Sequence, residues 1–356
     1  MGLLKRVFGS AGRSDPLQRA EELATAGDYR AAIALLQDAC EGDSDGRLAQ
    51  RLVDMRIEAF EKLTWPAPDV TWPPAHDDRF SAVSGFPEID ASALDAGALK
   101  AGILGKGGLI VRGLMQPTLV EEMRERVHLA LVARRDQVIG GPDAALAPWF
   151  NRSPRVRGGP VQFGKDDSNR YSESGSVWGV DSPLTAAALT GFYHDIGLPG
   201  MLHDYFQEAA VLSVRKWVLR CVEPNNNEKA GWHQDGRFLG NPAIRTVNLW
   251  IALTDCGTGM KAPGIELVGE NEGEIYATGT AGADFDWTVS QTLVDEIART
   301  HPVETPTFAA GDAIFFDHFN LHRTAFGTDH SENRYALESW FFAASTAPHK
   351  QQPVVL

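Results

Sequence analysis

A chain of 356 residues is long enough for one large domain with an accessory segment, or for two ordinary domains. Its 43% hydrophobic and 22% charged residues are typical of a globular protein with a substantial core. The formal net charge of −14 argues against nucleic acid as a general partner, because binding phosphate groups needs a basic surface.

The cysteines and the N-terminal residues indicate the cellular compartment of the protein. Cys40, Cys221 and Cys256 lie far apart and form no C-x-x-C pair, which excludes a cysteine zinc site and argues against a disulfide framework. The apolar run in MGLLKRVFGSAGRSD is too short for a signal peptide or a membrane span. We therefore expect a cytoplasmic protein that does not associate with membranes.

The segment Asp15–Leu63 has apolar positions at helical spacing. Within it, GDYRAAIALLQDAC resembles the second half of a tetratricopeptide unit, in which a Gly-Asp turn leads into a helix with small residues such as Ala32 and Ala39. Only one such unit is found, whereas a solenoid needs about three. We predict an N-terminal helical hairpin in residues 1–63, which either packs on the main domain or mediates contact with a protein partner or self-association.

Residues 64–98 are predicted to be a linker, because their five prolines are incompatible with a regular helix. The main domain is expected to span residues 99–356. Its first elements are a glycine turn, a short strand at Leu109–Val111 and an amphipathic helix with Pro117 in its first turn.

The chain then changes from helical to strand-like patterns. Pro148–Pro183 lacks periodicity, and its basic cluster is either a solvated loop or a lid that contacts an anionic group of the substrate. A further helix is expected over about Leu184–Ala210. Strand-like runs follow in VLSVRKWVLRCVE, TVNLWIALTD, DAIFFD and RYALESWFFAAS, with a helix at Val289–Thr300 between them. This order indicates an α+β chain that ends in an antiparallel barrel or jelly roll.

The motif WHQDG places an imidazole, His233, and a carboxylate, Asp235, two positions apart. In an extended chain, residues i and i+2 point to the same face, so both side chains converge on one point. Two histidines and one carboxylate on one face are the ligands of non-haem Fe(II) oxygenases. A third ligand is expected from a strand near the C-terminus, where His318 and His322 are the candidates.

The same spacing occurs twice more, in His76-Asp77-Asp78 and as H-x-E in His330-Ser331-Glu332. The first copy lies in the proline-rich segment and the second in a polar turn. Because no strand fixes the direction of these side chains, we interpret both copies as solvated loops.

The residues around the motif resemble the phytanoyl-CoA dioxygenase family over roughly Leu99–Ser345. In chain order they are WHQDG, NLWIAL, a Pro-Gly turn, GDAIFFDHFNLHRT and an arginine on the last strand. In that family an aspartate precedes the distal histidine by ten positions, as Asp312 precedes His322, which favours His322 over His318. The chain departs from the family at residues 263–266, which read PGIE where members often have Pro-Gly-Ser-His.

The resemblance implies a double-stranded β-helix (jelly-roll, cupin-like) core with flanking helices. It also implies Fe(II) as the metal, held by His233, Asp235 and His322. The cosubstrate would be 2-oxoglutarate, and its contacts would be Arg334, Thr324 and Trp250. A guanidinium suits the far carboxylate because it forms two parallel hydrogen bonds, to which a hydroxyl adds one more.

The implied reaction uses O2 and 2-oxoglutarate to hydroxylate, or otherwise oxidise, a small-molecule or acyl substrate, and it releases succinate and CO2. Two other interpretations stay open. In the first, the chain is a metal-dependent cupin-like enzyme that does not use 2-oxoglutarate. In the second, it is a catalytically silent scaffold with a helical docking hairpin. Lys216 and Arg220, on one face of the strand before the motif, either assist the cosubstrate or substrate or form a solvated face.

Overall fold

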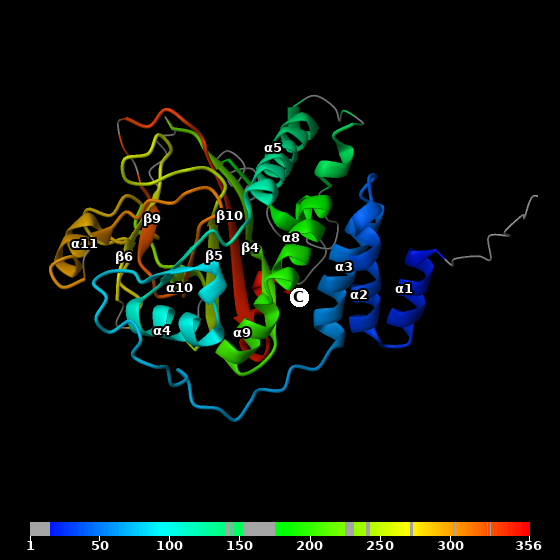
Figure 1. Cartoon of the computed structure of the whole chain (residues 1–356), viewed down its shortest axis with the longest axis horizontal. Helices are drawn as coiled ribbons and strands as arrows, with labels where there is room; N and C mark the ends of the chain where they lie inside the picture. Colours follow the sequence, from blue (N-terminus) through cyan, green and yellow to red (C-terminus); the bar gives the residue numbers. More distant parts are fainter. Residues whose placement is uncertain are drawn as a thin grey trace, which may run out of the picture.

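The structure of the chain is a computed structural model that describes residues 15–356, except 140–142, 144, 152–174, 225–230, 240–242, 271–272, 302, 326 and 328. The basic cluster predicted between Pro148 and Pro183 therefore lies outside the described residues. Figure 1 shows helices α1–α3 at one end of the molecule and the sheets at the other, with α5, α8 and α9 between them.

The N-terminal segment forms three helices, α1 (Pro16–Thr25), α2 (Tyr29–Ala39) and α3 (Arg47–Lys62), where the sequence predicts a helical hairpin. The Gly-Asp turn starts α2 as expected. The backbone of Gly27 has a φ of +87°, and the Asp28 carboxylate accepts a hydrogen bond of 3.1 Å from the Ala31 N–H. The third helix packs against α8 and β11, which joins this segment to the rest of the protein.

The predicted linker, residues 64–98, contains regular structure at its C-terminal end. Strand β1 (Glu88–Asp90) pairs in parallel with β2 (Leu109–Arg112), and α4 (Ala96–Lys106) begins before residue 99. Three residues are too few for an alternating pattern to be recognised, so the sequence gives no signal for β1.

Three helices cover one side of the large sheet: α5 (Pro117–Ile139), α8 (Pro183–Asp195) and α9 (Leu198–Phe206). The helical segment expected over about Leu184–Ala210 is present, but it is divided into two helices, α8 and α9. The chain breaks at Gly197, whose φ of +69° is left-handed, and strand β4 already begins at Ala210.

The large sheet has the order β1-β2-β8-β5-β10-β4-β11, with β3 paired to β4. Its further strands are β3 (Ser176–Trp178), β4 (Ala210–Val222), β5 (Thr246–Ala252), β8 (Ala313–Phe316), β10 (Arg334–Ala343) and β11 (Pro353–Val355). The four strand-like runs of the sequence are confirmed as β4, β5, β8 and β10. The described chain is thus a mixed α/β protein.

The second sheet has the order β7-β6-β9, with β6 (Ile265–Val268), β7 (Val303–Glu304) and β9 (His322–Thr324). The remaining helices are α10 (Gly236–Leu239) and α11 (Gln291–Ile297), and the second lies within the predicted helix Val289–Thr300. The 3₁₀ turns are η1 (Cys40–Gly42), η2 (Ala91–Ala93), η3 (Ala147–Trp149), η4 (Gly179–Asp181), η5 (Ala344–Thr346) and η6 (His349–Gln351).

Alternation along β5 and β10 divides their side chains between two environments. Leu249, Ile251, Leu337 and Phe341 pack with the helices in one apolar core. The intervening positions belong to the opposite face, where both sheets line a pocket. The fold therefore builds a dry layer on one face of the sheet and a polar site on the other.

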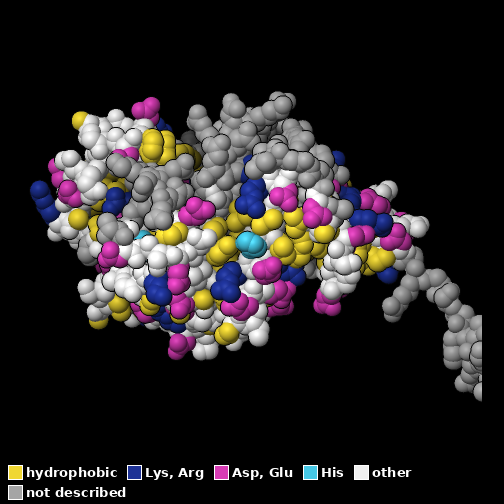
Figure 2. Space-filling model, turned by 90° about the horizontal axis from the view of Figure 1, so that it is seen from above, with side chains coloured by type: hydrophobic (Ala, Val, Ile, Leu, Met, Phe, Trp, Pro, Cys, Tyr) yellow, Lys and Arg dark blue, Asp and Glu magenta, His cyan; other side chains and the backbone are white. Residues whose placement is uncertain are grey.

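On the face shown in Figure 2, acidic and basic side chains are interspersed around a band of hydrophobic side chains. The described residues form no continuous basic patch on that face. None of the described helices has both the length and the apolar character needed to span a bilayer.

Candidate metal centre and its arginine

Two segments 89 positions apart in the chain meet at the candidate metal site. The backbones of His233 and His322 form an isolated antiparallel bridge, in which each N–H donates to the other carbonyl over 3.0 Å. One ligand atom each from His233, Asp235 and His322 lie within 4.8 Å of one another. The structure thus brings together the three residues that the sequence proposes as ligands.

Both imidazoles are oriented by backbone carbonyls. His233 Nδ1 lies 2.9 Å from the Gly231 carbonyl oxygen, and His322 Nδ1 lies 3.1 Å from that of Asn320. Because a carbonyl only accepts, each Nδ1 carries the proton and each Nε2 presents a lone pair. This is the usual second contact of a metal-bound histidine, so the donor set fits a divalent iron.

Electrostatics keep these donors in the forms that bind metal. Burial, together with the neighbouring His322, lowers the pKa of His233 to about 3. Burial alone would raise the pKa of Asp235, but the charge of Lys216 lowers it to about 2. Lys216 Nζ hydrogen-bonds Asp235 Oδ1, while Oδ2 lies 3.7 Å from His322 Nε2. One carboxylate oxygen therefore stays directed at the imidazoles.

A glycine allows the tight approach of the WHQDG loop to the late strands. A Cβ on Gly236 would lie 2.4 Å from Ile275 Cδ1 and 2.9 Å from the His318 carbonyl oxygen. The Gly236 N–H donates to that same oxygen over 2.9 Å. A larger residue would push the metal loop away from the strand that carries His322.

Arg334, Thr324 and Trp250, the predicted contacts of 2-oxoglutarate, line the same pocket of about 240 Å³. Arg334 is 2% exposed, and its Nη1 donates to the Gly264 carbonyl oxygen over 2.6 Å. The guanidinium carbon lies 5.6 Å from the centre of the Trp250 ring. Burial lowers the pKa of Arg334 to about 10, so the side chain keeps its charge at neutral pH.

Arg334 has no carboxylate within ion-pair distance among the described residues. Its hydrogen-bond acceptors are the uncharged backbone carbonyls of Pro263 and Gly264. These carbonyls belong to the Pro-Gly turn, which directly precedes Ile265 and Glu266, the two positions at which the sequence departs from the family pattern. A buried cation held only by neutral acceptors is suited to an anionic ligand.

The other histidines named from the sequence stay outside the donor set. His318 is buried and its Nδ1 lies 2.9 Å from Thr246 Oγ1, while His76 is exposed and His330 is partly exposed. None of them belongs to the metal-competent cluster found among the described residues. Gln234 also points away from the pocket, since its amide nitrogen donates to the carbonyls of Glu274 and Phe319 over 2.8 and 2.7 Å.

Of the two cations on β4, Lys216 contacts Asp235, and Arg220 pairs with Glu338 over 3.0 Å. Both line the metal pocket rather than a solvated face. Sequence reasoning missed several other lining residues. Period-two alternation from Trp250 and Arg334 identifies some of them, namely Asn248, Glu338 and Trp340.

Phe238 and Trp287 also line the pocket and were not anticipated. Trp287 lies in the loop that precedes α11, where the sequence has no periodicity. Its ring centre is 5.7 Å from that of His233 and 5.9 Å from that of Phe238. No local pattern could have placed this ring at the site, because only the folded loop brings it there.

Comparisons with known proteins place the chain in a family. The profile of the family Phytanoyl-CoA dioxygenase (PhyH) matches residues 105–328. The apo crystal structure of EctD from S. alaskensis has a TM-score of 0.50 and 14% identity, covering 72% of this chain and 79% of that one. SnoK, a non-heme alpha-ketoglutarate-dependent carbocyclase from nogalamycin biosynthesis, has a TM-score of 0.45 and 16% identity, covering 72% and 86%. No curated protein sequence matches the chain.

Fold, donor set and family profile together define a non-haem iron oxidoreductase. Because the profile spans more than half of the sequence, the chain belongs to the phytanoyl-CoA dioxygenase family. It is an Fe(II)- and 2-oxoglutarate-dependent dioxygenase, whose cofactors are iron and 2-oxoglutarate and whose reaction uses O2. Family membership favours this activity over the 2-oxoglutarate-independent enzyme and over the silent scaffold.

Proposed function

We propose that the protein hydroxylates a C–H bond of a small molecule, with His233, Asp235 and His322 as its iron ligands. The observation that carries this proposal is the convergence of three ligand atoms within 4.8 Å, with both Nδ1 atoms occupied by carbonyls. Bound iron and 2-oxoglutarate supply the oxidising chemistry, which consumes O2 and releases succinate and CO2.

Arg334 and Thr324 bind the far carboxylate of 2-oxoglutarate in this proposal. Both are buried and line the pocket, Thr324 from β9 and Arg334 from β10. Trp250 forms the wall beside the guanidinium. Since carbonyl oxygens restrain Arg334 before any ligand arrives, little side-chain entropy is lost on binding. The protein thereby orients the cosubstrate and excludes water from it.

The aromatic side chains at the pocket support a substrate with a flat apolar part. Phe285 and Trp287 stack with ring centres 5.4 Å apart and an interplanar angle of 2°, and they are 45% and 38% exposed. Phe238, 36% exposed, has its ring centre 5.9 Å from that of Trp287. Exposed rings beside a reactive centre are suited to stacking against a ligand. The predicted anionic group on the substrate stays a prediction.

We assign the two sheets, apart from β1, to a double-stranded β-helix within residues 99–356. The shared pocket supports this, since it draws lining residues from β4, β5, β6, β9 and β10. Residues 1–63 are treated as an accessory helical segment joined through residues 64–98. A role of these helices in self-association, or in binding a protein partner, stays a prediction.

Anaerobic addition of Fe(II) and 2-oxoglutarate to the metal-free protein tests the iron site. We expect a visible metal-to-ligand charge-transfer band that is lost in His233→Ala and that needs a higher 2-oxoglutarate concentration in Arg334→Ala. His330→Ala is the matched control, since His330 repeats the H-x-E pattern outside the cluster, and it should keep the band. Absence of the band in correctly folded wild-type protein would sink the proposal.

A further inference from the structure

A second cavity, here called the junction cavity, lies between the N-terminal helices and the body of the protein. Its volume of about 680 Å³ is within the range of small-molecule sites. Its walls come from α2, η1, α3, α5, α8 and β11. None of the described residues lines both this cavity and the metal pocket. The junction cavity is therefore a separate site, and nothing in the proposed oxygenase reaction uses it.

The floor of the junction cavity contains a buried cation, Arg56, which is 2% exposed. Its Nη1 donates to the Val355 carbonyl oxygen over 2.8 Å, and its Nη2 donates to Gln37 Oε1 over 3.0 Å. A guanidinium has five N–H donors, so these bonds use two of them. No carboxylate lies within ion-pair distance of Arg56 among the described residues.

Arg56 keeps its charge in this position. Burial lowers its pKa to about 10, which leaves the guanidinium protonated at neutral pH. A buried charge without a counter-ion is costly, and an anion that enters the cavity would compensate it. Arg334 is likewise fully buried, donates to neutral acceptors and lines a cavity. Its expected partner is the carboxylate of 2-oxoglutarate.

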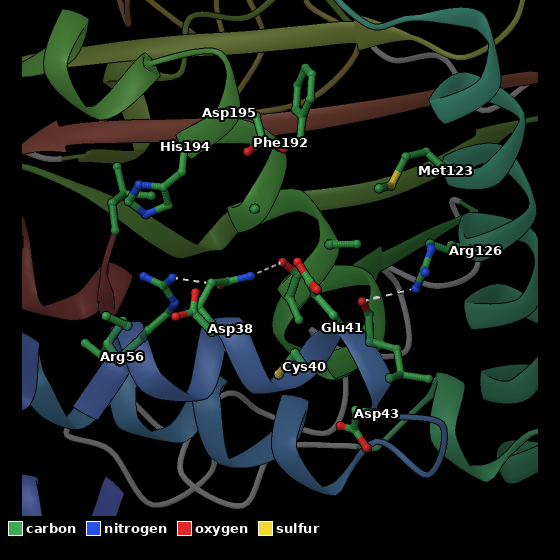
Figure 3. Close-up of a pocket in the computed structure, with 18 of the residues that line it drawn as sticks. Asp38, Cys40, Glu41, Asp43, Arg56, Met123, Arg126, Phe192, His194 and Asp195 are labelled. Carbon is green, nitrogen blue, oxygen red and sulfur yellow. Dashed lines mark hydrogen bonds between the residues drawn. The ribbon is translucent and has the colours of Figure 1, made fainter. Parts of the chain in front are cut away.

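Gln37 holds the guanidinium in a fixed orientation. Its Oε1 also accepts a hydrogen bond of 2.8 Å from Thr190 Oγ1, and its Nε2 donates to the Ala187 carbonyl oxygen over 3.0 Å. The amide is thereby tied to α8, and Arg56 is tied to the amide. In Figure 3, Arg56, Asp38 and His194 lie at one end of the cavity, and Met123 and Arg126 lie at the other.

Acidic side chains surround the opening. Asp38, Glu41 and Asp195 are exposed, line the cavity and have no ion pair among the described residues. Among the other charged lining groups, Arg126 pairs with Glu122 over 2.7 Å, Arg30 lies over the Trp65 ring at 5.8 Å, and Asp43 accepts backbone N–H groups at the start of α3. The cavity therefore offers positive charge at its floor, and at its rim three carboxylates beside one exposed cation, Arg30.

Apolar side chains form much of the remaining wall: Ile33, Leu119, Met123, Leu184 and Phe192. Such a wall can bury an apolar group of a ligand whose charged ends face Arg56 and the rim.

We propose that the junction cavity binds a small zwitterion, with its carboxylate on Arg56, its ammonium on Asp38 and Asp195, and an apolar side chain against the wall. This is the chemistry of an apolar or aromatic α-amino acid. A ligand with a carboxylate alone would face the acidic rim, and one with an amine alone would lack a partner for Arg56. A ligand needs both charges to pair with Arg56 at the floor and with the carboxylates at the rim.

Calorimetry on the full chain with three probes of one shape tests the proposal: L-phenylalanine, 3-phenylpropanoate, which lacks the ammonium, and 2-phenylethylamine, which lacks the carboxylate. We expect L-phenylalanine to bind at least about tenfold more tightly than either of the others, the effect of one charge-assisted hydrogen bond. Equal affinity of all three probes, or no binding of L-phenylalanine up to its solubility limit, would overturn the proposal.

Variants locate each charge. Arg56→Gln should lower the affinity for L-phenylalanine about tenfold or more, so that it equals the affinity for 2-phenylethylamine. Because Arg56 is buried, this variant has to be checked for folding by circular dichroism. The exposed double variant Asp38→Asn/Asp195→Asn avoids that difficulty. It should lower the affinity for L-phenylalanine without lowering the affinity for 3-phenylpropanoate. An unchanged affinity for L-phenylalanine would contradict the proposal.

Arg334→Leu separates the junction cavity from the metal pocket. We expect this variant to bind L-phenylalanine like the wild type, with or without iron. Loss of binding in Arg334→Leu but not in Arg56→Gln would place the probe in the metal pocket and overturn the proposal. Since no iron is required for the measurement, a failure of the proposed oxygenase reaction would leave this result unaffected.

Discussion

The metal pocket and the junction cavity each contain one fully buried arginine, but different elements surround the two. Arg334 lies on a strand whose alternate side chains line a pocket of about 240 Å³. Arg56 lies on a helix, and the walls of its 680 Å³ cavity are mostly helices from two parts of the chain. Hydrogen-bonded strands aim several polar groups at one point, whereas packed helices leave a wider space with charges at its rim.

Anion binding and catalysis depend on different groups in these two sites. Each arginine is restrained by neutral acceptors and has no carboxylate partner among the described residues. Only the metal pocket adds two imidazoles and a carboxylate within 4.8 Å. A buried unpaired guanidinium therefore indicates an anion site, and the groups around it decide whether a reaction follows.

The largest effect is expected from removing one predicted iron ligand. His322→Ala should lower the affinity for Fe(II) by at least about a hundredfold, because two protein ligands cannot complete the facial site. Binding of L-phenylalanine at the junction cavity should not change. Fe(II) titration of the folded metal-free protein, with calorimetry for the amino acid, measures both. Wild-type iron affinity in this variant would remove His322 from the site.

Replacing each arginine by leucine in turn should affect the binding of a different ligand. Arg334→Leu is expected to weaken 2-oxoglutarate by roughly ten- to a hundredfold, which corresponds to the loss of about 1.5–3 kcal/mol from charge-assisted hydrogen bonds. Arg56→Leu should leave 2-oxoglutarate affinity unchanged. Anaerobic titration of the charge-transfer band with 2-oxoglutarate reports both values. Equal losses in the two variants would show that the pockets are not independent.

Lys216 is expected to have a moderate effect on the metal pocket alone. Lys216→Met removes the cation that hydrogen-bonds Asp235 Oδ1, so the carboxylate loses its orientation and Fe(II) affinity should fall roughly ten- to a hundredfold. Lys216→Arg keeps a cation there and should retain more of the affinity. Tighter iron binding in Lys216→Met would mean that the ammonium competes with the metal instead of orienting its ligand.

The smallest effect is expected on the titration of His194 in the junction cavity. Burial, and then the charge of Arg56, lower the pKa of His194. Stability from neutral His194 is therefore present above the unfolded pKa of about 6.5 and is lost as the pH falls below it. In Arg56→Gln the pKa of His194 should rise, and this acid sensitivity should decrease. NMR titration of the imidazole measures the change.

Arg126→Gln is the matched control for this titration. Arg126 lines the same cavity but pairs with Glu122 over 2.7 Å. Its removal should leave the His194 titration as in the wild type. An equal rise in both variants would mean that general surface charge, and not Arg56, sets the pKa of His194.

Local patterns in the sequence predicted most of the sheet and the candidate metal residues. The alternation in β4 and the apolar runs of β5 and β10 are strong signals because they extend over seven or more residues. Shorter elements such as β1 and β9 have three residues each, which is too few for a period to be recognised. The break at Gly197 was missed because leucines and alanines on both sides suit one helix.

The sequence by itself determined which residues could form a metal centre, because H-x-D spacing and strand alternation are local properties of the backbone. It also determined the family, through motifs within residues 105–328. Only the tertiary structure decided that His322 meets His233, that Trp287 lies beside them and that Arg56 is buried with no carboxylate partner among the described residues. These features depend on which segments pack together, and packing between distant segments leaves no periodic signal in either one.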